Sequence, residues 1–380
     1  MRIVLAGLLA VTAWGAPARA DIALSSNDAH TILDNGVQVV PPEAAADTLS
    51  VIDLAASPPS ILATLDVPGS VVGPPMAVTI ARDESFAIVT SATKADPAGP
   101  GGISPDNRVS VVDLTASPPK VVQTLQAGAG ATTVRIAPDG TLALVANRFA
   151  GTLSVFTIQD RRLTPAGTVM IDPKSMPSGI AFTADGKSAL VTRNGDHMVQ
   201  VLNIDGTKVT LGARPITTGV APYSIDVTAD GTVAAVGNMG RGDGDADTVS
   251  LIDLTAQPFR TVQTISVGRS PEGVKWSPDG KFLAIGAQEG TTKPADNPFR
   301  RDRGRLVMFA LADKQLRQVA EAPIGRWSQG LAFSRDGRTV LVQNMVERTI
   351  QVFRWDGTKL WAGTQLELGA GPAAIATAWP

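Results

Sequence analysis

A short pattern that recurs seven times is the feature that most constrains what this chain can fold into. Three copies are nearly identical: each runs Ser, two aliphatic residues, Asp and Leu, beginning at Ser50, Ser110 and Ser250. Four weaker copies occur at Ser154-Val155-Phe156, Gln200-Val201-Leu202, Leu306-Val307-Met308 and Gln351-Val352-Phe353. The copies are spaced by 44 to 60 residues, and the shortest spacings match the roughly 40–50-residue period of propeller blades.

A second recurring element follows each copy: a short apolar strand, a turn, and another apolar strand. The turns are Asp139-Gly140, Asp185-Gly186, Asp230-Gly231, Asp279-Gly280 and Asp336-Gly337, with Asp83-Glu84 as a degenerate sixth. Asp-Gly between apolar runs signals a tight hairpin, expected here as a type I′ turn with positive φ at both residues. Each unit therefore predicts two hairpins, and the chain an all-β, seven-bladed β-propeller of four-stranded antiparallel blades.

The seventh unit lacks its Asp-Gly turn, because the chain ends soon after an apolar stretch near residue 371. Residues 22–26 (IALSS) supply a candidate for the missing strand, since they precede the first full copy. We expect this N-terminal strand to pair with the C-terminal strand and close the ring. Closure removes the exposed inner edge of an open array.

The first twenty residues predict a cleaved secretory signal peptide. Arg2 provides a positive start, residues 3–13 are apolar, and Ala18-Arg19-Ala20 is a cleavage signal before Asp21. The apolar run is shorter than the roughly 20 residues that a membrane span needs. The expected mature protein is a single propeller domain, residues 21–380, periplasmic or secreted, with no membrane span; we expect a monomer.

Charge and composition exclude several classes of function. Without residues 1–20 the net charge is about −4, which argues against the broad basic surface of a nucleic-acid-binding protein. The chain has no cysteine and only two histidines, His30 and His197. Cysteine nucleophiles, thiolate metal sites, c-type haem attachment and multi-histidine centres are therefore excluded.

The repeat resembles that of the YVTN β-propeller family, in which a strand ending Tyr-Val-Thr-Asn precedes a Thr-Val-x-Val-Ile-Asp strand. Matching segments end at Asn147, Asn194, Asn238 and Asn344, always without the tyrosine; the only Tyr in the chain is Tyr223. The resemblance covers essentially residues 21–380. It implies the propeller fold but leaves the function open, because the family includes surface-layer-type proteins and relatives of lactonases and of amine dehydrogenase heavy subunits.

Four connections on one face of the expected ring are long: residues 27–47, 93–108, 239–247 and 287–305. Insertions gathered on one face of a repeat array favour a binding face there; tolerated, solvated insertions are the alternative. The polar residues expected around the channel rim on this face are Asn147, Arg148, Arg193, Asn194, Tyr223, Asn238, Glu272, Gln288, Glu289, Trp327, Gln329 and Asn344.

These rim residues support two interpretations. The asparagines recur at one repeat position, which favours a structural role at strand ends, with ligand binding as the alternative. Arg148 and Arg193 depart from the repeat consensus on neighbouring blades, so together they could bind a carboxylate or phosphate. The alternative is that each arginine forms an ordinary ion pair on the surface.

Two loop segments carry dense charge. Asp243, Asp245 and Asp247 alternate as at the start of a calcium loop, but the Gly and Glu that an EF-hand needs are missing, so Ca²⁺ is a weak candidate against a simple turn. No other cofactor is expected. Arg300, Arg301, Arg303 and Arg305 form the only dense basic run. A solvated loop with local Asp pairing is the favoured interpretation, and an anion-attracting surface or contact with nucleic acid or a membrane surface are the alternatives.

No recognised catalytic motif is present in the sequence. A Walker A loop, an H-E-x-x-H helix, a G-x-S-x-G elbow and a dinucleotide fingerprint are all missing. His197 is a weak candidate for a general base and Glu272 for an acid, but neither has a visible partner. The lactonases of the family that this repeat resembles carry a His next to the proline that opens an inner strand. This chain has Pro222-Tyr223 and Pro271-Glu272 at that position, which argues against the lactonase interpretation.

Two functions of different classes remain. The first is an exported propeller that binds a small anionic ligand or a periplasmic protein through its long-loop face and channel mouth. The second is a lactonase-like hydrolase acting on a small anionic substrate. An accessory role in a periplasmic quinoprotein dehydrogenase system is a third option that the resemblance implies.

Overall fold

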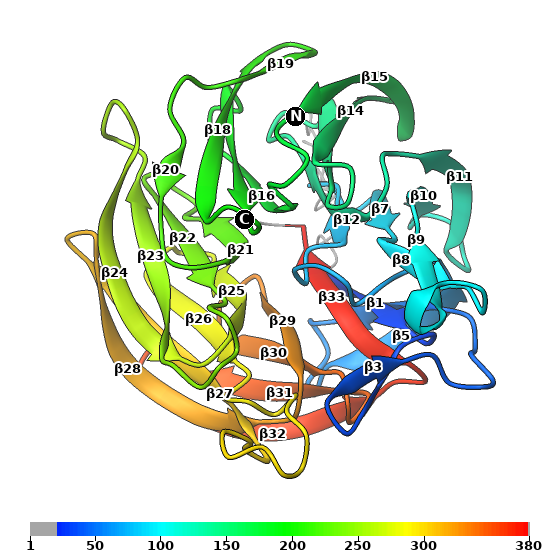
Figure 1. Ribbon diagram of the computed structural model, residues 1–380, viewed down its shortest axis with the longest axis vertical. Coiled ribbons are helices and arrows are strands. Elements are labelled where there is room, and N and C mark those ends of the chain that lie inside the picture. The colour runs from blue at the N-terminus through cyan, green and yellow to red at the C-terminus, as the bar shows by residue number, and fades with distance from the viewer. Residues whose placement is uncertain (1–20, 379–380) are drawn as a thin grey trace, which may run out of the picture.

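The computed structural model describes residues 21–378, and these form seven four-stranded antiparallel blades arranged in a ring (Figure 1). The predicted all-β, seven-bladed propeller is confirmed. Residues 1–20, to which the signal-peptide prediction refers, and residues 379–380 lie outside the described part. Residues 21–378 contain no helix with the length and hydropathy needed to cross a bilayer.

The blades are numbered 1 to 7 around the ring, with strands given from the channel outward. Blade 1 contains β33 (Gly371–Thr377), β1 (Ile22–Asp28), β4 (Thr48–Asp53) and β5 (Ser60–Asp66). Blade 2 contains β6 (Val78–Ile80), β7 (Phe86–Thr90), β10 (Arg108–Asp113) and β11 (Lys120–Gln126). Blade 3 contains β12 (Ala131–Ile136), β13 (Leu142–Asn147), β14 (Thr152–Gln159) and β15 (Arg162–Met170). Blade 4 contains β16 (Pro177–Phe182), β17 (Ser188–Arg193), β18 (Met198–Asp205) and β19 (Lys208–Leu211), with β20 (Ile216–Thr217) also paired to β18.

The remaining blades follow the same plan. Blade 5 contains β21 (Pro222–Val227), β22 (Val233–Asn238), β23 (Asp247–Asp253) and β24 (Arg260–Gly268). Blade 6 contains β25 (Pro271–Trp276), β26 (Phe282–Ala287), β27 (Gly304–Ala312) and β28 (Gln315–Ile324). Blade 7 contains β29 (Ser328–Phe333), β30 (Thr339–Asn344), β31 (Thr349–Trp355) and β32 (Leu360–Glu367).

The N-terminal strand completes blade 1, as the truncated seventh repeat predicts. Strand β1 pairs with the C-terminal strand β33 on one side and with β4 on the other, so that Ser25 lies opposite both Ile375 and Ser50. The ring is therefore closed by hydrogen bonds between the two ends of the chain. Closure leaves the innermost strand of every blade facing the channel, with no blade left short.

The inner hairpins turn differently from the sequence expectation. In the turn after β12, the N–H of Gly140 donates to the carbonyl of Ala137 at 2.9 Å, and Gly140 has a φ of 76° whereas Asp139 does not adopt positive φ. The expected type I′ geometry was wrong. The turn is centred on Pro138 and Asp139, and only the glycine after it needs the left-handed region. In the degenerate copy Glu84 adopts this conformation itself, with a φ of 59°.

Seven apolar clusters hold the ring together, one between each pair of neighbouring blades. The cluster between blades 7 and 1 contains Leu341 and Val352 from one blade and Ala23 and Ile52 from the other. The aliphatic residues of the repeat therefore pack on the faces of adjacent blades. The core is a closed chain of interfaces rather than one central mass.

The two faces of the ring differ. Every inner strand begins at one face, here called the long-loop face, and ends at the other, the turn face, which carries the Asp-Gly turns. The long-loop face bears two small hairpins, β2 (Ile32–Asp34) with β3 (Val37–Val39) and β8 (Thr93–Ala95) with β9 (Ile103–Pro105), and the 3₁₀ turn η1 (Pro100–Gly102) (Figure 1).

Candidate functional site

The long loops join into a continuous wall on the long-loop face. The N–H of Ala295 donates to Oδ1 of Asn35 at 2.8 Å, which links the loop of blade 6 to the β2–β3 hairpin of blade 1. That hairpin contacts η1 of blade 2, and Gly244 of blade 5 lies against Phe299 of blade 6. The expected grouping of four insertions on one face is thus present, spanning blades 5, 6, 1 and 2.

A fifth insertion, which the sequence analysis did not single out, crosses the channel. Residues 69–76, here called the strap, connect β5 to β6 and reach far beyond their own blade. Met76 packs in the apolar cluster between blades 4 and 5, and Val71 packs with Trp327 of blade 7. The Thr132 hydroxyl of blade 3 donates to the Val72 carbonyl at 2.8 Å. The strap therefore closes the channel at the long-loop face.

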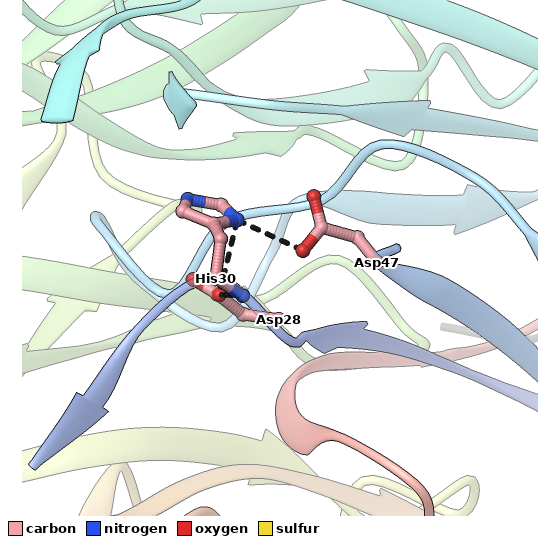
Figure 2. Close-up of side chains that lie close together, drawn as sticks. All are labelled: Asp28, His30 and Asp47. Carbon is pink, nitrogen blue, oxygen red and sulfur yellow. Dashed lines mark hydrogen bonds and ion pairs between the residues drawn. The ribbon is translucent and has the colours of Figure 1, made fainter. Parts of the chain in front are cut away.

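A buried trio, Asp28, His30 and Asp47, anchors the strap (Figure 2). Nδ1 of His30 lies 2.8 Å from Asp47 and 3.2 Å from Asp28. The N–H groups of Val71 and Gly69 donate to Asp28 and Asp47 at 2.8 and 3.2 Å. Both groups that the strap contributes to this network are backbone N–H groups. The trio therefore fixes the path of the strap backbone.

The trio has the composition of a metal-binding group, since its ligand atoms lie close together. Oδ1 of Asp28, however, already accepts the N–H groups of His30 and Thr31 at 2.9 and 2.7 Å. Burial raises the pKa of Asp28 to about 6. Burial alone would lower the pKa of His30, but the hydrogen bond with Asp47 and the charges of both carboxylates raise it. Because both carboxylates already accept backbone N–H groups, the arrangement fits a hydrogen-bonded clamp better than a metal site.

Several predicted rim residues meet beneath the strap. The guanidinium of Arg148 donates to Ser178 and, at 2.8 Å, to Oδ1 of Asn194, and it lies 5.6 Å from the ring centre of Tyr223. The Tyr223 hydroxyl is hydrogen-bonded to the backbone of Gly73 in the strap, and burial raises its pKa above the ordinary value. Arg148, Asn194 and Tyr223 are thus brought together, as the sequence suggested.

Glu272 lies next to this group and is buried, with 4% of its surface exposed. Gln288 donates to its carboxyl group, and the buried Gln329 side chain lies near it. Burial raises the pKa of Glu272 to about 8. Burial therefore favours the protonated form of Glu272 at neutral pH.

Other predicted residues do not join this cluster. Arg193 turns to Asp196 and to Gln200, so it does not share a site with Arg148. Nδ1 of His197 accepts the N–H of Ala221 at 3.1 Å. Trp327 is buried beneath the β2–β3 hairpin with Leu33. These placements favour structural roles for all three.

The rim asparagines serve their own blades. The side-chain amide of Asn147 donates to Thr152 and Ser154 at 2.9 Å each, and Asn238 repeats the pattern with Thr248 and Ser250 at 3.0 Å. Asn344 is likewise buried, and its Oδ1 accepts the N–H of Gly325 at 2.9 Å. The recurring Asn therefore holds the start of the third strand of its own blade by hydrogen bonds. This favours a structural role over ligand binding for these asparagines.

The charged loops are largely self-paired. Arg305 bridges Glu289 and Glu321 at 2.9 and 2.8 Å. Asp247 accepts the N–H of Ser270 at 2.8 Å, and burial raises its pKa. Asp243 and Asp245 do not form a metal-binding group with Asp247 among residues 21–378. Calcium binding there remains a prediction.

The central channel contains a cavity of about 520 Å³. Pro75 and Met76 of the strap line one end, and Asp83 and Asp139 of the turns line the other, so the cavity opens at the turn face. Its wall carries Arg135, Asp226 and Lys275, none of which the sequence analysis identified. Their position in the repeat was the signal that could have found them. Each lies four residues before the Asp of its turn, whereas blades 4 and 7 carry the small residues Ala181 and Ala332 at that position.

Comparisons with known proteins agree with this architecture. A family model described as "Lactonase, 7-bladed beta-propeller" matches residues 107–221, from blade 2 to the start of blade 5. No curated protein matches the chain in sequence. The finer resemblance to the YVTN-repeat group remains a prediction from the repeat.

Solved structures share the fold at low sequence identity. A protein of Bacteroides fragilis NCTC 9343 assigned provisionally as a 6-phosphogluconolactonase is 16% identical, with a TM-score of 0.72 over 96% of this chain and 99% of that one. The periplasmic gluconolactonase of Pseudomonas aeruginosa is 20% identical, with a TM-score of 0.66 over 93% and 99%. Hydrazine synthase of Kuenenia stuttgartiensis is 18% identical, with a TM-score of 0.63 over 82% and 91%. At these identities the likeness shows the fold, which is a lactonase-like seven-bladed propeller.

Proposed function

We propose that this protein is an exported propeller that binds a small molecule inside its central channel, with entry from the turn face. The observation that carries the proposal is the 520 Å³ cavity, which the strap closes at one end and which is open at the other. Its size lies within the roughly 300–1,000 Å³ of small-molecule sites. Export rests on the signal-peptide pattern of residues 1–20.

The composition of the cavity wall supports a small-molecule binding site rather than a water-filled channel. Phe86, Phe182 and Leu331 give apolar surface, and Arg135, Asp226 and Lys275 lie at one level of the channel. Ligand sites commonly combine apolar walls with a small number of placed polar groups. On the long-loop face, by contrast, the predicted residues bond to one another and to the strap.

A filled-channel variant tests this proposal. Thr79 lines the cavity, so Thr79→Trp should occupy it, whereas Thr141→Trp places the same side chain on the exposed turn nearby. Three molecules of similar size and different charge serve as probes: benzoate, benzamide and benzylamine. We expect at least one to raise the Tm of the wild type and of Thr141→Trp but not of Thr79→Trp. Binding that survives Thr79→Trp would place the ligand elsewhere.

A second function, hydrolysis of a small lactone, is favoured by one observation. The pKa of Glu272 is raised to about 8, so its protonated form is favoured at neutral pH, and it lies close to Tyr223, over whose ring Arg148 sits. Such a group could give its proton to the leaving alkoxide as water adds to the lactone carbonyl, and then take up the proton that the water loses, so that a hydroxy acid forms and Glu272 is protonated again. Because the strap covers this cluster, turnover requires the strap to move. Hydrolysis of a simple δ-lactone by the wild type, lost in Glu272→Gln, would support this function; equal rates in both would exclude Glu272.

A further inference from the structure

Three charged side chains lie at a single level of the channel. Arg135 of β12, Asp226 of β21 and Lys275 of β25 occupy the same register position in their blades, opposite Leu144, Ala235 and Ala284 of the second strands. At the equivalent position the other four blades carry small residues: Thr79, Ala181, Ala332 and Ala376. Charged side chains therefore occur at this level of the channel only on blades 3, 5 and 6 of the seven.

Two of the three charges neutralise each other. Nζ of Lys275 lies 3.2 Å from Oδ2 of Asp226, and the N–H of Trp276 donates to the same oxygen at 2.8 Å. Asp226 is thus held by neighbouring blade 6. With this pair formed, the level retains one net positive charge, that of Arg135.

Arg135 has no carboxylate of its own. Its Nη1 donates to the carbonyls of Met76, Val78 and Val134 at 3.3, 3.2 and 3.0 Å, and within residues 21–378 it takes part in no ion pair. All three bonds come from Nη1, so these contacts leave Nε and Nη2 free to bind a ligand on a residue that lines the cavity. Burial lowers the pKa of Arg135 to about 10, opposed only by the more distant charge of Asp226. A partly buried cation without a counter-ion gains from an anionic ligand.

The rest of the wall defines the body of that ligand. Ile136, Phe182 and Val227 lie around the level of the charges, and Met76 closes the end of the cavity. An apolar body would be buried against these side chains while a planar oxyanion faces the guanidinium. Acidic and basic groups at the open end, Arg82, Asp83 and Asp139, sit at the turns rather than at this level.

We propose that Arg135 anchors the oxyanion headgroup of a small organic anion with an apolar body, bound in the channel at the level of the Asp226–Lys275 pair and on its turn-face side. The inference rests on the proposed function, since it names the class of ligand that the channel accepts. A carboxylate and a phosphate monoester share this chemistry. Arg135, Asp226 and Lys275 are specificity-determining residues in this account.

Binding of benzoate, benzamide, benzylamine and phenyl phosphate, measured by calorimetry, tests the inference. We expect benzoate or phenyl phosphate to bind most tightly in the wild type, and the better of the two identifies the headgroup. Arg135→Met should weaken that anion about ten- to hundredfold, the usual loss of a charge-assisted pair, whereas Arg135→Lys should retain part of the affinity. Arg161→Met removes an exposed arginine paired with Asp113 and should change nothing.

A second variant keeps the test independent of the folding of Arg135→Met. Asp226→Asn raises the net charge of the level by one, so it should tighten binding of the anion. Equal affinities for benzoate and benzamide, or tightest binding of benzylamine, would overturn the anion inference while the channel function stands. If no probe binds, or if the Thr79→Trp variant binds the anion normally, both the inference and the proposed function fail.

Discussion

The backbone N–H of Val71 donates a 2.8 Å hydrogen bond to Oδ2 of Asp28. Asp28 ends the strand that closes the ring, and Val71 belongs to the strap that closes the channel. One carboxylate therefore couples the two closures. The strap cannot leave the channel without giving up this bond, and the bond depends on the N-terminal strand being in place.

Removing the Asp28 carboxylate should release the strap. Asp28→Ala leaves the N–H groups of His30, Thr31 and Val71 without acceptors in a buried site. We expect a loss of roughly 3 kcal/mol of unfolding free energy, from about 1–3 kcal/mol per buried unsatisfied group. Urea denaturation measures the loss, and hydrogen exchange of residues 69–76 should accelerate.

The matched control is Asp356→Ala, which removes an exposed aspartate that accepts the N–H groups of Thr358 and Lys359. Its outer turn is remote from the strap in sequence, so exchange of residues 69–76 should stay as in the wild type. Unchanged strap exchange in Asp28→Ala would show that Asp28 does not hold the strap.

Gly73 is the strap residue least able to accept a side chain. Its φ is 118°, and an added Cβ would lie 1.5 Å from Oγ1 of Thr132. Gly73→Ala should therefore displace the strap and expose Tyr223, while the blades remain folded. The fluorescence of the single tyrosine is hard to isolate beside that of six tryptophans. Limited proteolysis between residues 69 and 76 is therefore the better measurement. A variant as resistant as the wild type would contradict the packing described here.

The contrast between ring and strap explains what the sequence could predict. The ring follows from a repeat: SVIDL strands, Asp-Gly turns and an orphan N-terminal strand each determine local structure that recurs, so the pairing of β1 with β33 was predictable. The strap is a single insertion, and its path depends on partners on blades 3, 5 and 7 that no local pattern reveals.

The candidate site divides in the same way. Arg148 was found because it breaks the repeat, Tyr223 and Glu272 because they open inner strands, and Asn194 because it recurs at one repeat position; the structure brings them together. Arg135 escaped notice because a charged residue inside a short strand looks like an exposed position in an alternating pattern. Only the register across blades shows that it faces the channel.

Closure of the ring should make a large contribution to stability. Leu24 on the N-terminal strand is fully buried between blades 1 and 2. Leu24→Ala should cost about 3 kcal/mol, within the usual range for a buried leucine. Leu62→Ala on the outer strand of the same blade, where 60% of the side chain is exposed, should cost less than about 0.5 kcal/mol. Similar urea midpoints for the two variants would refute closure through β1.

Glu272 predicts a specific pH dependence. Its folded pKa of about 8 lies above its ordinary value of 4.5, so the folded state keeps a proton that the unfolded state loses. The stability from this group is full below pH 4.5 and declines as the pH rises through 8. Glu272→Gln mimics the protonated acid, so it should become more stable than the wild type as the pH rises from 5 to 8, by up to about 1.4 kcal/mol per pH unit. Urea unfolding of both proteins at several pH values measures this, and parallel stability curves would show that Glu272 is ionised in the folded state.

The central claim is that the channel, and not the long-loop face, receives an anion at Arg135. A crystal of the protein soaked in 4-bromobenzoate tests it most directly, because bromine gives an anomalous signal that locates the molecule. We predict a peak inside the channel, with the carboxylate against Arg135 and the bromine directed toward the apolar wall near Phe182. A peak beside Arg148 or Arg193 on the long-loop face, with the channel empty, would contradict the account.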